Sequence, residues 1–151
     1  MGNSETMIIV EDFMATGIQT LCETDSIVAA AALMEKYNCY HLPVINAKQK
    51  LIGLVTHRDL QRALPSQFFP PSEHGIQPEA IPVSEIMRRN LITVSPDAGL
   101  HQAAMFLRNQ RIGCLPVIKN DKLVGIITDS DFLAVAVELL TELDHLEPIA
   151  M

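Results

Sequence analysis

The strongest constraint on the fold is an internal repeat. A shift of 73 positions places Met14 on Met87 and the tetrapeptide Leu-Pro-Val-Ile at 42–45 on the same tetrapeptide at 115–118. One residue then drops out of the following turn. A shift of 72 matches Gly53 with Gly125, Thr56 with Thr128 and Asp59 with Asp131. A repeat of this length predicts that one structural unit is used twice.

Each copy is predicted to fold as strand, helix, strand, strand, helix. Short apolar runs at 18–21 and 91–94 predict the first strands. Apolar residues at helical spacing predict helices at 27–37 and 100–110, with Asp25 or Ser26 and Asp97 as their N-caps. Hairpins are predicted for 42–45 with 51–56 and for 115–118 with 123–128, and closing helices for 59–64 and 131–143. The predicted fold class is therefore α/β (α+β).

The repeat also predicts the domain boundaries. The first domain is placed at residues 10–64 and the second at 83–143, with a C-terminal tail at 144–151. Residues 65–82 between the copies contain five prolines and show no periodicity. Proline lacks an amide donor and clashes with the preceding helical turn, so this segment is predicted to be a linker.

Charge and cysteine content exclude several classes of protein. The formal net charge of −7 disfavours nucleic acid and anionic membrane as partners, because both are bound through basic surfaces. Three cysteines without a CxxC spacing do not predict a disulfide framework. The N-terminal apolar run is too short for a signal core, and no run approaches the length of a membrane span. These features predict a cytoplasmic protein.

A motif at the end of each hairpin carries a resemblance to a known family. Gly-Leu-Val-Thr-His-Arg-Asp-Leu stands at 53–60, and Gly-Ile-Ile-Thr-Asp-Ser-Asp-Phe at 125–132, each downstream of a hydrophobic-Pro-Val sequence. In this duplicated frame, over 10–64 and 83–137, the chain resembles the CBS-domain family. The resemblance implies two tandem CBS domains packed through their sheets with pseudo-two-fold symmetry, an arrangement often called a Bateman module. It also implies a regulatory ligand such as AMP, ATP, ADP or S-adenosylmethionine in the crevices between the domains, with no catalytic cofactor.

The resemblance implies particular ligand contacts. In the family the motif Asp accepts hydrogen bonds from ribose hydroxyls, and the motif Thr lies near ribose and phosphate. These roles fall here on Asp59 and Asp131 and on Thr56 and Thr128. Opposite Thr128 and Asp131 the resemblance places Met14, Ile18, Gln19, Tyr40, His41 and Pro43. Opposite Thr56 and Asp59 it places Met87, Leu91, Ile92, Gly113, Cys114 and Pro116.

The chemistry of the motif supports these roles independently. A carboxylate accepts hydrogen bonds only, and it can take both hydroxyls of a cis-diol. The Thr–Asp spacing of three places both side chains at a helix N-terminus, where free amides and the helix dipole attract phosphate. The alternative is that Thr56 and Thr128 are N-caps whose capping boxes are closed by Asp59 and Asp131. Capping and ligand binding are compatible.

The two crevices are predicted to differ in charge and size. His57 and Arg58 give the Thr56/Asp59 crevice a cationic rim suited to phosphate, and Gly113 stands where the other copy has Tyr40. The other copy has Asp129 and Ser130 in place of His57 and Arg58. We therefore predict a phosphorylated ligand in the Thr56/Asp59 crevice and an uncharged or cationic adenosyl ligand beside Asp131.

The sequence does not predict an enzyme. Cys22, Cys39 and His41 lack the spacing of a metal or thiol site, and no HExxH, Gly-rich phosphate loop or nucleophile elbow occurs. The second interpretation of the chain is a ligand-free scaffold for dimerisation or for another protein. The resemblance implies a homodimer in either case, and the Ala-rich stretch 29–32 would let two helices approach closely. An additional protein partner, not identified by the sequence, is part of the scaffold interpretation.

Overall fold

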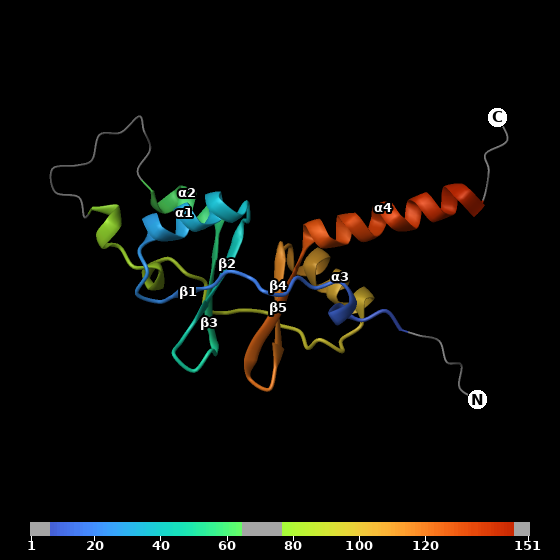
Figure 1. Ribbon diagram of the computed structural model, residues 1–151, viewed down its shortest axis with the longest axis horizontal. Coiled ribbons are helices and arrows are strands. Elements are labelled where there is room, and N and C mark those ends of the chain that lie inside the picture. The colour runs from blue at the N-terminus through green and yellow to red at the C-terminus, as the bar shows by residue number, and fades with distance from the viewer. Residues whose placement is uncertain (1–6, 65–76, 147–151) are drawn as a thin grey trace. The chain divides into compact units, whose positions relative to one another are not determined.

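The computed structural model describes residues 7–64 and 77–146. Within these residues the mixed α+β fold is confirmed, with four α-helices and two small sheets (Figure 1). The elements are β1 (Leu21–Cys22), α1 (Ile27–Tyr37), β2 (His41–Ile45), β3 (Leu51–Thr56), α2 (His57–Ala63), α3 (Leu100–Gln110), β4 (Cys114–Lys119), β5 (Lys122–Thr128) and α4 (Asp129–Leu146). Short 3₁₀ turns lie at Val10–Asp12, Pro78–Ala80 and Val83–Glu85. Residues 65–76 of the predicted linker and 147–151 of the predicted tail lie outside the described residues.

The described residues form two compact units. The α1 unit comprises residues 17–64, 77–92 and 120–123, and the α3 unit comprises residues 7–16, 93–119 and 124–146. Each unit therefore holds the helices and the hairpin of one repeat, apart from residues 120–123, together with the first residues of the other repeat. Compact units and sequence repeats are thus two different divisions of the chain.

Backbone hydrogen bonds attach each of these leading segments to its unit. In the α3 unit, Val10 N donates to Ala98 O at 2.9 Å, and Ala15 and Ile126 exchange both backbone hydrogen bonds, at 2.8 and 3.0 Å. In the α1 unit, Val83 N donates to Asp25 O at 2.7 Å. There Arg88 and Leu54 exchange the same pair of bonds, at 2.9 and 3.0 Å. The Arg88–Leu54 bridge and the Ala15–Ile126 bridge occupy matching positions of the two repeats.

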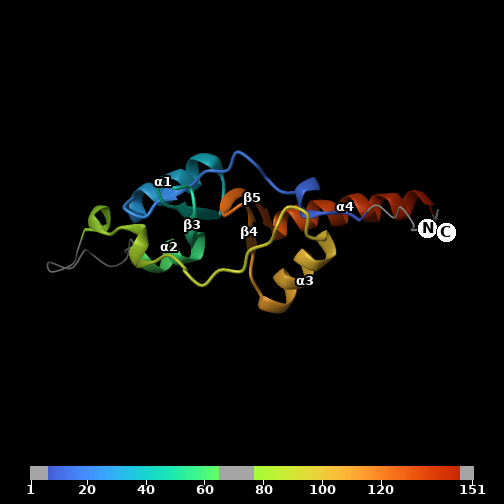
Figure 2. The same cartoon turned by 90° about the horizontal axis from the view of Figure 1, so that it is seen from below.

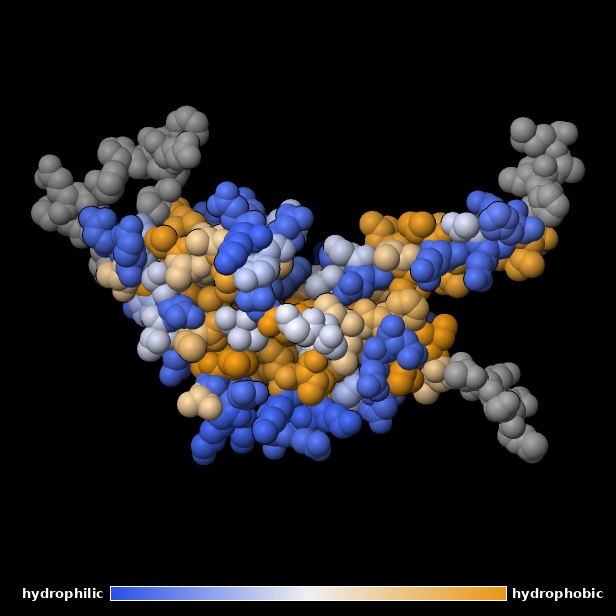
Figure 3. Space-filling model, viewed as in Figure 1, coloured by the Kyte–Doolittle hydropathy of each residue, from blue (hydrophilic) through white to orange (hydrophobic). Residues whose placement is uncertain are grey.

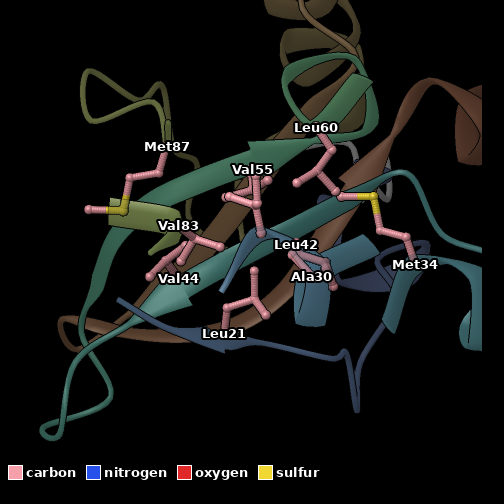
Figure 4. Close-up of a cluster of buried hydrophobic side chains, with 10 residues drawn as sticks. Leu21, Ala30, Met34, Leu42, Val44, Val55, Leu60, Val83 and Met87 are labelled. Carbon is pink, nitrogen blue, oxygen red and sulfur yellow. The ribbon is translucent and has the colours of Figure 1, made fainter. Parts of the chain in front are cut away.

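A three-stranded sheet with two helices forms the body of the α1 unit. Strand β1 is parallel to β2, and β2 is antiparallel to β3 with His41 opposite Thr56. Helix α1 packs against α2 and β2, and α2 packs against β3 (Figures 1 and 2). The side chains between them form an apolar cluster (Figure 4), which includes Leu21, Ala30, Met34, Leu42, Val44, Val55, Leu60, Val83 and Met87. Burial of this cluster holds the end of β3 in place, and the motif Thr56 stands at that end.

The first strand of each copy is shorter than the sequence predicts. β1 begins at Leu21 rather than at residue 18, and in the second copy Val94 alone forms a bridge, to Val117 of β4. Both pairings are parallel, and in each the next amide toward the start of the strand would have to come from Pro43 or Pro116. Proline has no amide hydrogen, so the ladder ends there. The apolar runs at 18–21 and 91–94 do not reveal this limit, because it is set by the partner strand.

The helix predictions are confirmed for α1 and α3, and one of the predicted caps is wrong. Ser26 is the N-cap of α1, and its Oγ accepts from Ala29 N at 3.0 Å. The N-cap of α3 is Gly99 rather than Asp97. Gly99 stands at the repeat position of Ser26 and has no side chain for capping, while Asp97 accepts a hydrogen bond from Ser95 Oγ. The repeat therefore keeps the helix start but not its side-chain cap.

Candidate functional site

The first motif forms a closed turn where β3 passes into α2. Thr56 is the N-cap of α2, and its Oγ1 accepts from Asp59 N at 3.2 Å. In return, Asp59 Oδ2 accepts from Thr56 N at 3.1 Å. The predicted capping box is therefore present. It fixes the position of the Asp59 carboxylate, whose side chain is 11% exposed.

A cation that the sequence analysis did not single out holds this carboxylate. Arg88 Nε donates to Asp59 Oδ2 and Arg88 Nη2 donates to Asp59 Oδ1, both at 3.2 Å. The contact is a two-pronged pair in which each guanidinium nitrogen meets its own carboxylate oxygen. Both oxygens of the predicted ribose reader are thus engaged within the α1 unit.

The surroundings of Asp59 act on its pKa in opposite directions. Desolvation by burial is the largest single influence and raises the pKa. The hydrogen bonds from Arg88 and Thr56, together with the charge of Arg88, outweigh it and place the pKa below its ordinary value. Asp59 is therefore ionised at neutral pH and presents a full negative charge.

The second motif repeats the turn with a different pattern of donors. Asp131 Oδ2 accepts from Thr128 N at 2.8 Å and from Thr128 Oγ1 at 3.2 Å. The Thr128 hydroxyl therefore donates to the carboxylate, whereas the Thr56 hydroxyl accepts from an amide. Among the described residues of the α3 unit, only Thr128 donates to Asp131. The second turn has the same spacing but no arginine of its own unit.

Each turn lies beside a close contact between methionine and glycine. A Cβ at Gly53 would overlap the side chain of Met87, and a Cβ at Gly125 would lie 2.7 Å from the sulfur of Met14. These contacts place the predicted ligand-contact residues Met87 and Met14 against the strands that end in Thr56 and Thr128. Both methionines precede the residue that forms the backbone bridge, Arg88 in one unit and Ala15 in the other.

The role of His57 and Arg58 as a cationic rim stays a prediction, and a third cation, Arg88, contacts the motif carboxylate. His57 and Arg58 are both exposed at the start of α2. The rings of His57 and Tyr40 form a T-shaped pair with 5.4 Å between their centroids, and His57 N donates to Tyr40 O at 2.8 Å. The cation that reaches the motif carboxylate is Arg88. The repeat could have drawn attention to this residue. A shift of 73 places Arg88 on Ala15, so the copies differ directly after the matched methionines.

The other predicted contacts are divided between the units. Ile18, Gln19, Tyr40, His41, Pro43, Leu91 and Ile92 lie in the α1 unit with Thr56 and Asp59, and Gly113, Cys114 and Pro116 lie in the α3 unit with Thr128 and Asp131. Gly113 O accepts from Asp129 N at 3.0 Å. Contacts predicted between residues of different units stay predictions.

The cysteines and acidic residues do not assemble a metal site within residues 7–64 and 77–146, where no group of three or more potential ligands occurs. The pKa of the Cys114 thiol is raised to about 12, first by desolvation on burial and then by the charges of Asp129 and Asp131. Such a thiol is protonated at neutral pH and is a poor nucleophile or metal ligand. No helix of the described residues is long and apolar enough to span a bilayer.

Comparison with known proteins places this geometry in a family. A family model described as CBS domain matches residues 10–66 and 83–149. Among solved structures, a protein from Vibrio cholerae named for acetoin utilization (AcuB) is 39% identical, with 94% of this chain and 99% of that chain covered and a TM-score of 0.77. The CBS domain pair of protein MJ0100, in complex with 5′-methylthioadenosine and S-adenosyl-L-methionine, is 27% identical over 87% of this chain and 98% of its own, with a TM-score of 0.75.

Curated relatives fall into two groups by length. The CBS domain-containing protein YhcV of Bacillus subtilis is 30% identical over 83% of both chains. Homoserine O-acetyltransferase of Methanococcus vannielii is 32% identical over 80% of this chain, which corresponds to 23% of that enzyme. The chain thus spans less than a quarter of the acetyltransferase.

Proposed function

The chain belongs to the CBS domain family and contains two CBS domains in tandem, and on this premise we propose that it binds an adenosine-containing ligand beside Asp59 and Asp131. CBS-domain pair proteins are typically regulatory, so the bound ligand would act as an effector. The effector class comprises AMP, ADP, ATP and S-adenosylmethionine. We do not propose acetyl transfer for this chain, because the match to homoserine O-acetyltransferase covers only 23% of that protein.

The observation that supports this function best is the pair of matched turns. In each, an Asp carboxylate is positioned three residues after a Thr by a hydrogen bond from the Thr amide. A carboxylate offers about four acceptor positions. Asp131 keeps room for both hydroxyls of a ribose cis-diol beside its two bonds from Thr128, and Asp59 gains that room when Arg88 releases one of its two bonds. The MJ0100 pair, which is 27% identical, was crystallised with two ligands that both contain adenosine. Both ligands share adenine and the ribose cis-diol with AMP and ATP, and the cis-diol is the part that a carboxylate can accept from.

Replacement of each carboxylate by its amide tests the proposal. We expect Asp59→Asn and Asp131→Asn each to weaken adenosine-ligand binding by about 1–3 kcal/mol, the scale of a lost hydrogen bond to a charged group. Equilibrium dialysis against adenosine, AMP and S-adenosylmethionine measures the loss, and thermal melting checks the fold.

Asp12→Asn is a matched control for these variants. Its Oδ2 also accepts from an amide three residues earlier, Ile9 N at 3.1 Å, but Asp12 lies outside both motifs. Wild-type affinity in both motif variants, or an equal loss in Asp12→Asn, would contradict the assignment of the ribose readers.

A second candidate function, self-association, has its own supporting observation in α4. None of the 18 residues of this helix is buried by the described residues, and apolar surface runs along it in Figure 3. Leu133, Val137 and Leu140 share one face at helical spacing and are 67%, 57% and 59% exposed. Apolar surface of this kind marks an interaction site.

The partner that we propose for this face is a second copy of the chain. With a net charge of −7, two copies would repel each other through most surfaces, whereas Leu133, Val137 and Leu140 carry no charge. Glu138 and Glu142 lie on another face of the same helix and could stay in water. Self-association and ligand binding are compatible, and ligand dialysis on wild-type protein separates a sensor from a ligand-free scaffold.

A further inference from the structure

The two units differ at one side chain that the backbone places identically. Arg88 exchanges two backbone hydrogen bonds with Leu54, and Ala15 exchanges the same two with Ile126. Leu54 and Ile126 each precede their motif Thr by two residues. The bridge therefore brings one residue of the leading segment next to each motif turn. In one unit this residue carries a guanidinium, and in the other it carries a methyl group.

The guanidinium occupies the acceptor positions that a ribose would use. Its Nε and Nη2 engage Oδ2 and Oδ1 of Asp59, each at 3.2 Å. A cis-diol donates to the same two oxygens, so Arg88 must release at least one of them when ribose binds. The Arg88 side chain is 50% exposed, so its guanidinium can turn into solvent without disturbing the apolar core.

We propose that Arg88 is an exchangeable counter-ion, which pairs with Asp59 when the site is empty and with a phosphate of the ligand when it is filled, and so selects phosphorylated adenosine at this site. This inference rests on the proposed binding of an adenosine ligand beside Asp59. The ribose and the 5′-phosphate belong to one nucleotide, so a long, flexible side chain that reaches Asp59 is well placed to reach a phosphate next to it. Arginine suits this exchange because its planar fork fits carboxylate and phosphate equally.

Charge balance gives the exchange its selectivity. Ribose binding breaks at least one hydrogen bond between Arg88 and Asp59, whether or not the ligand has a phosphate. An unphosphorylated nucleoside leaves the released guanidinium with water alone, whereas a nucleotide supplies a new anionic partner. Without Arg88, the phosphate would instead approach the uncompensated negative charge of Asp59. With Arg88 present, the site therefore favours the nucleotide. Without Arg88, repulsion between phosphate and Asp59 removes that preference.

The second site lacks this selector. Ala15 stands at the position of Arg88, and the described residues of the α3 unit provide no ion pair to Asp131. Ribose can therefore reach Asp131 without displacing an arginine of that unit. The prediction of an uncharged or cationic adenosyl ligand beside Asp131 is consistent with this difference.

Comparison of two ligands in one variant tests the proposal. Calorimetry with AMP and adenosine is carried out on the 151-residue chain carrying Asp131→Asn, so that binding beside Asp59 dominates the signal. We expect Arg88→Ala to weaken the affinity for AMP by at least about tenfold, through loss of charge-assisted hydrogen bonds to the phosphate. The same change should leave the affinity for adenosine unchanged or raise it by up to about fivefold, because the partly exposed Arg88–Asp59 ion pair no longer has to be broken. In protein with Arg88, added salt should narrow the preference for AMP.

Two further variants make the result specific. Arg89→Ala removes the neighbouring guanidinium, which donates to Ser84 O at 3.0 Å, and it should leave the ratio of the two affinities unchanged. Arg88→Lys keeps the charge but loses the fork, and it should give an intermediate ratio. It also serves as the test variant if thermal melting shows that Arg88→Ala does not fold.

The possible failures are distinguishable. Equal weakening of AMP and adenosine in Arg88→Ala, or no change in either, would overturn the role of Arg88 and leave ribose reading by Asp59 intact. If protein with Arg88 and intact Asp59 binds neither ligand there, the proposed function of the site itself fails.

Discussion

At the scale of single residues, the two motif glycines differ in what stands against them. A Cβ at Gly53 would meet the flexible Met87 side chain and, at 3.2 Å, the carbonyl oxygen of Arg88. A Cβ at Gly125 would lie 2.9 Å from the carbonyl oxygen of Ala15, which a side-chain rotation cannot relieve. We therefore expect Gly125→Ala to destabilise the fold by about 1–3 kcal/mol, and Gly53→Ala by less. Urea unfolding measures both, and an equal or reversed order would contradict the prediction.

The cysteines should differ in reactivity. The Cys114 side chain is buried and its pKa is raised to about 12, first by desolvation and then by the charges of Asp129 and Asp131. Cys22 is exposed. At pH 8 we expect an alkylating reagent to label Cys22 in the native protein and Cys114 only after unfolding, because the thiolate is the reactive form. Peptide mass spectrometry reads out the two sites, and fast native labelling of Cys114 would show that its burial is wrong.

The ion pair of Asp59 predicts a dependence of stability on pH. Its pKa is lower in the folded protein than in the unfolded chain, so its contribution is present above the unfolded value of about 3.9 and is lost as pH falls through the folded value. The gap in free energy of unfolding between wild type and Asp59→Asn should therefore shrink as the pH is lowered from 6 toward about 3. Arg88→Ala should narrow this gap at neutral pH. Urea titrations across the range test the sign, and a gap that grows in acid would contradict it.

At the scale of elements, the two repeats differ most at the starts of their first helices. Ser26 Oγ caps α1, whereas α3 begins after Gly99 without a side-chain cap. We expect Ser26→Ala to cost about 1 kcal/mol of stability. Asp97→Ala, at the position that the sequence wrongly predicts as a cap, should cost less because Asp97 accepts from Ser95 rather than from the helix. Chemical denaturation of the two variants compares them directly, and equal losses would contradict the assignment of the caps.

The elements that the sequence predicts best are those defined by local periodicity. Helices α1 and α3 have the predicted bounds, and both hairpins are present. The lengths of the first strands were not predictable from their own residues, since Pro43 and Pro116 on the partner strands limit them. The contact of Arg88 with Asp59 joins residues 29 positions apart. It depends on the Leu54–Arg88 bridge, which no local pattern encodes.

At the scale of the whole molecule, the repeat predicted that one structural unit is used twice. The resemblance carried by the Thr–Asp motifs predicted two tandem CBS domains, which the family match confirms. It did not predict that residues 7–16 join the second repeat and residues 83–92 the first in the compact units. Those contacts are backbone hydrogen bonds, such as Val10 N to Ala98 O, which any side chain permits. The sequence pattern therefore does not predict that the first residues of each repeat pack in the unit of the other repeat. It shows only the matched methionines, Met14 and Met87, that lie in these segments.

Self-association through α4 is the prediction that belongs to this scale. We expect sedimentation at tens of micromolar to give about twice the mass of the 16.7 kDa chain. Leu140→Glu should shift the protein toward one chain, because it places a charge on the apolar face. His145→Glu adds a carboxylate at an exposed position about 140° around the helix from Leu140 and serves as the control. A single-chain mass for wild type, or equal dissociation in both variants, would contradict a dimer formed through this face.

The exchange of leading segments has a consequence for protein synthesis. Residues 7–16 are synthesised well before their backbone partners Ala98 and Ile126, which belong to the second repeat. The α1 unit, by contrast, has most of its residues available once residue 92 has left the exit tunnel. We therefore expect the α1 unit to be able to fold during synthesis before residues 7–16 gain their partners. A product that stops after the first repeat would lack Ala98 and Ile126, the backbone partners of Val10 and Ala15, and it would also lack residues 83–92 of the α1 unit.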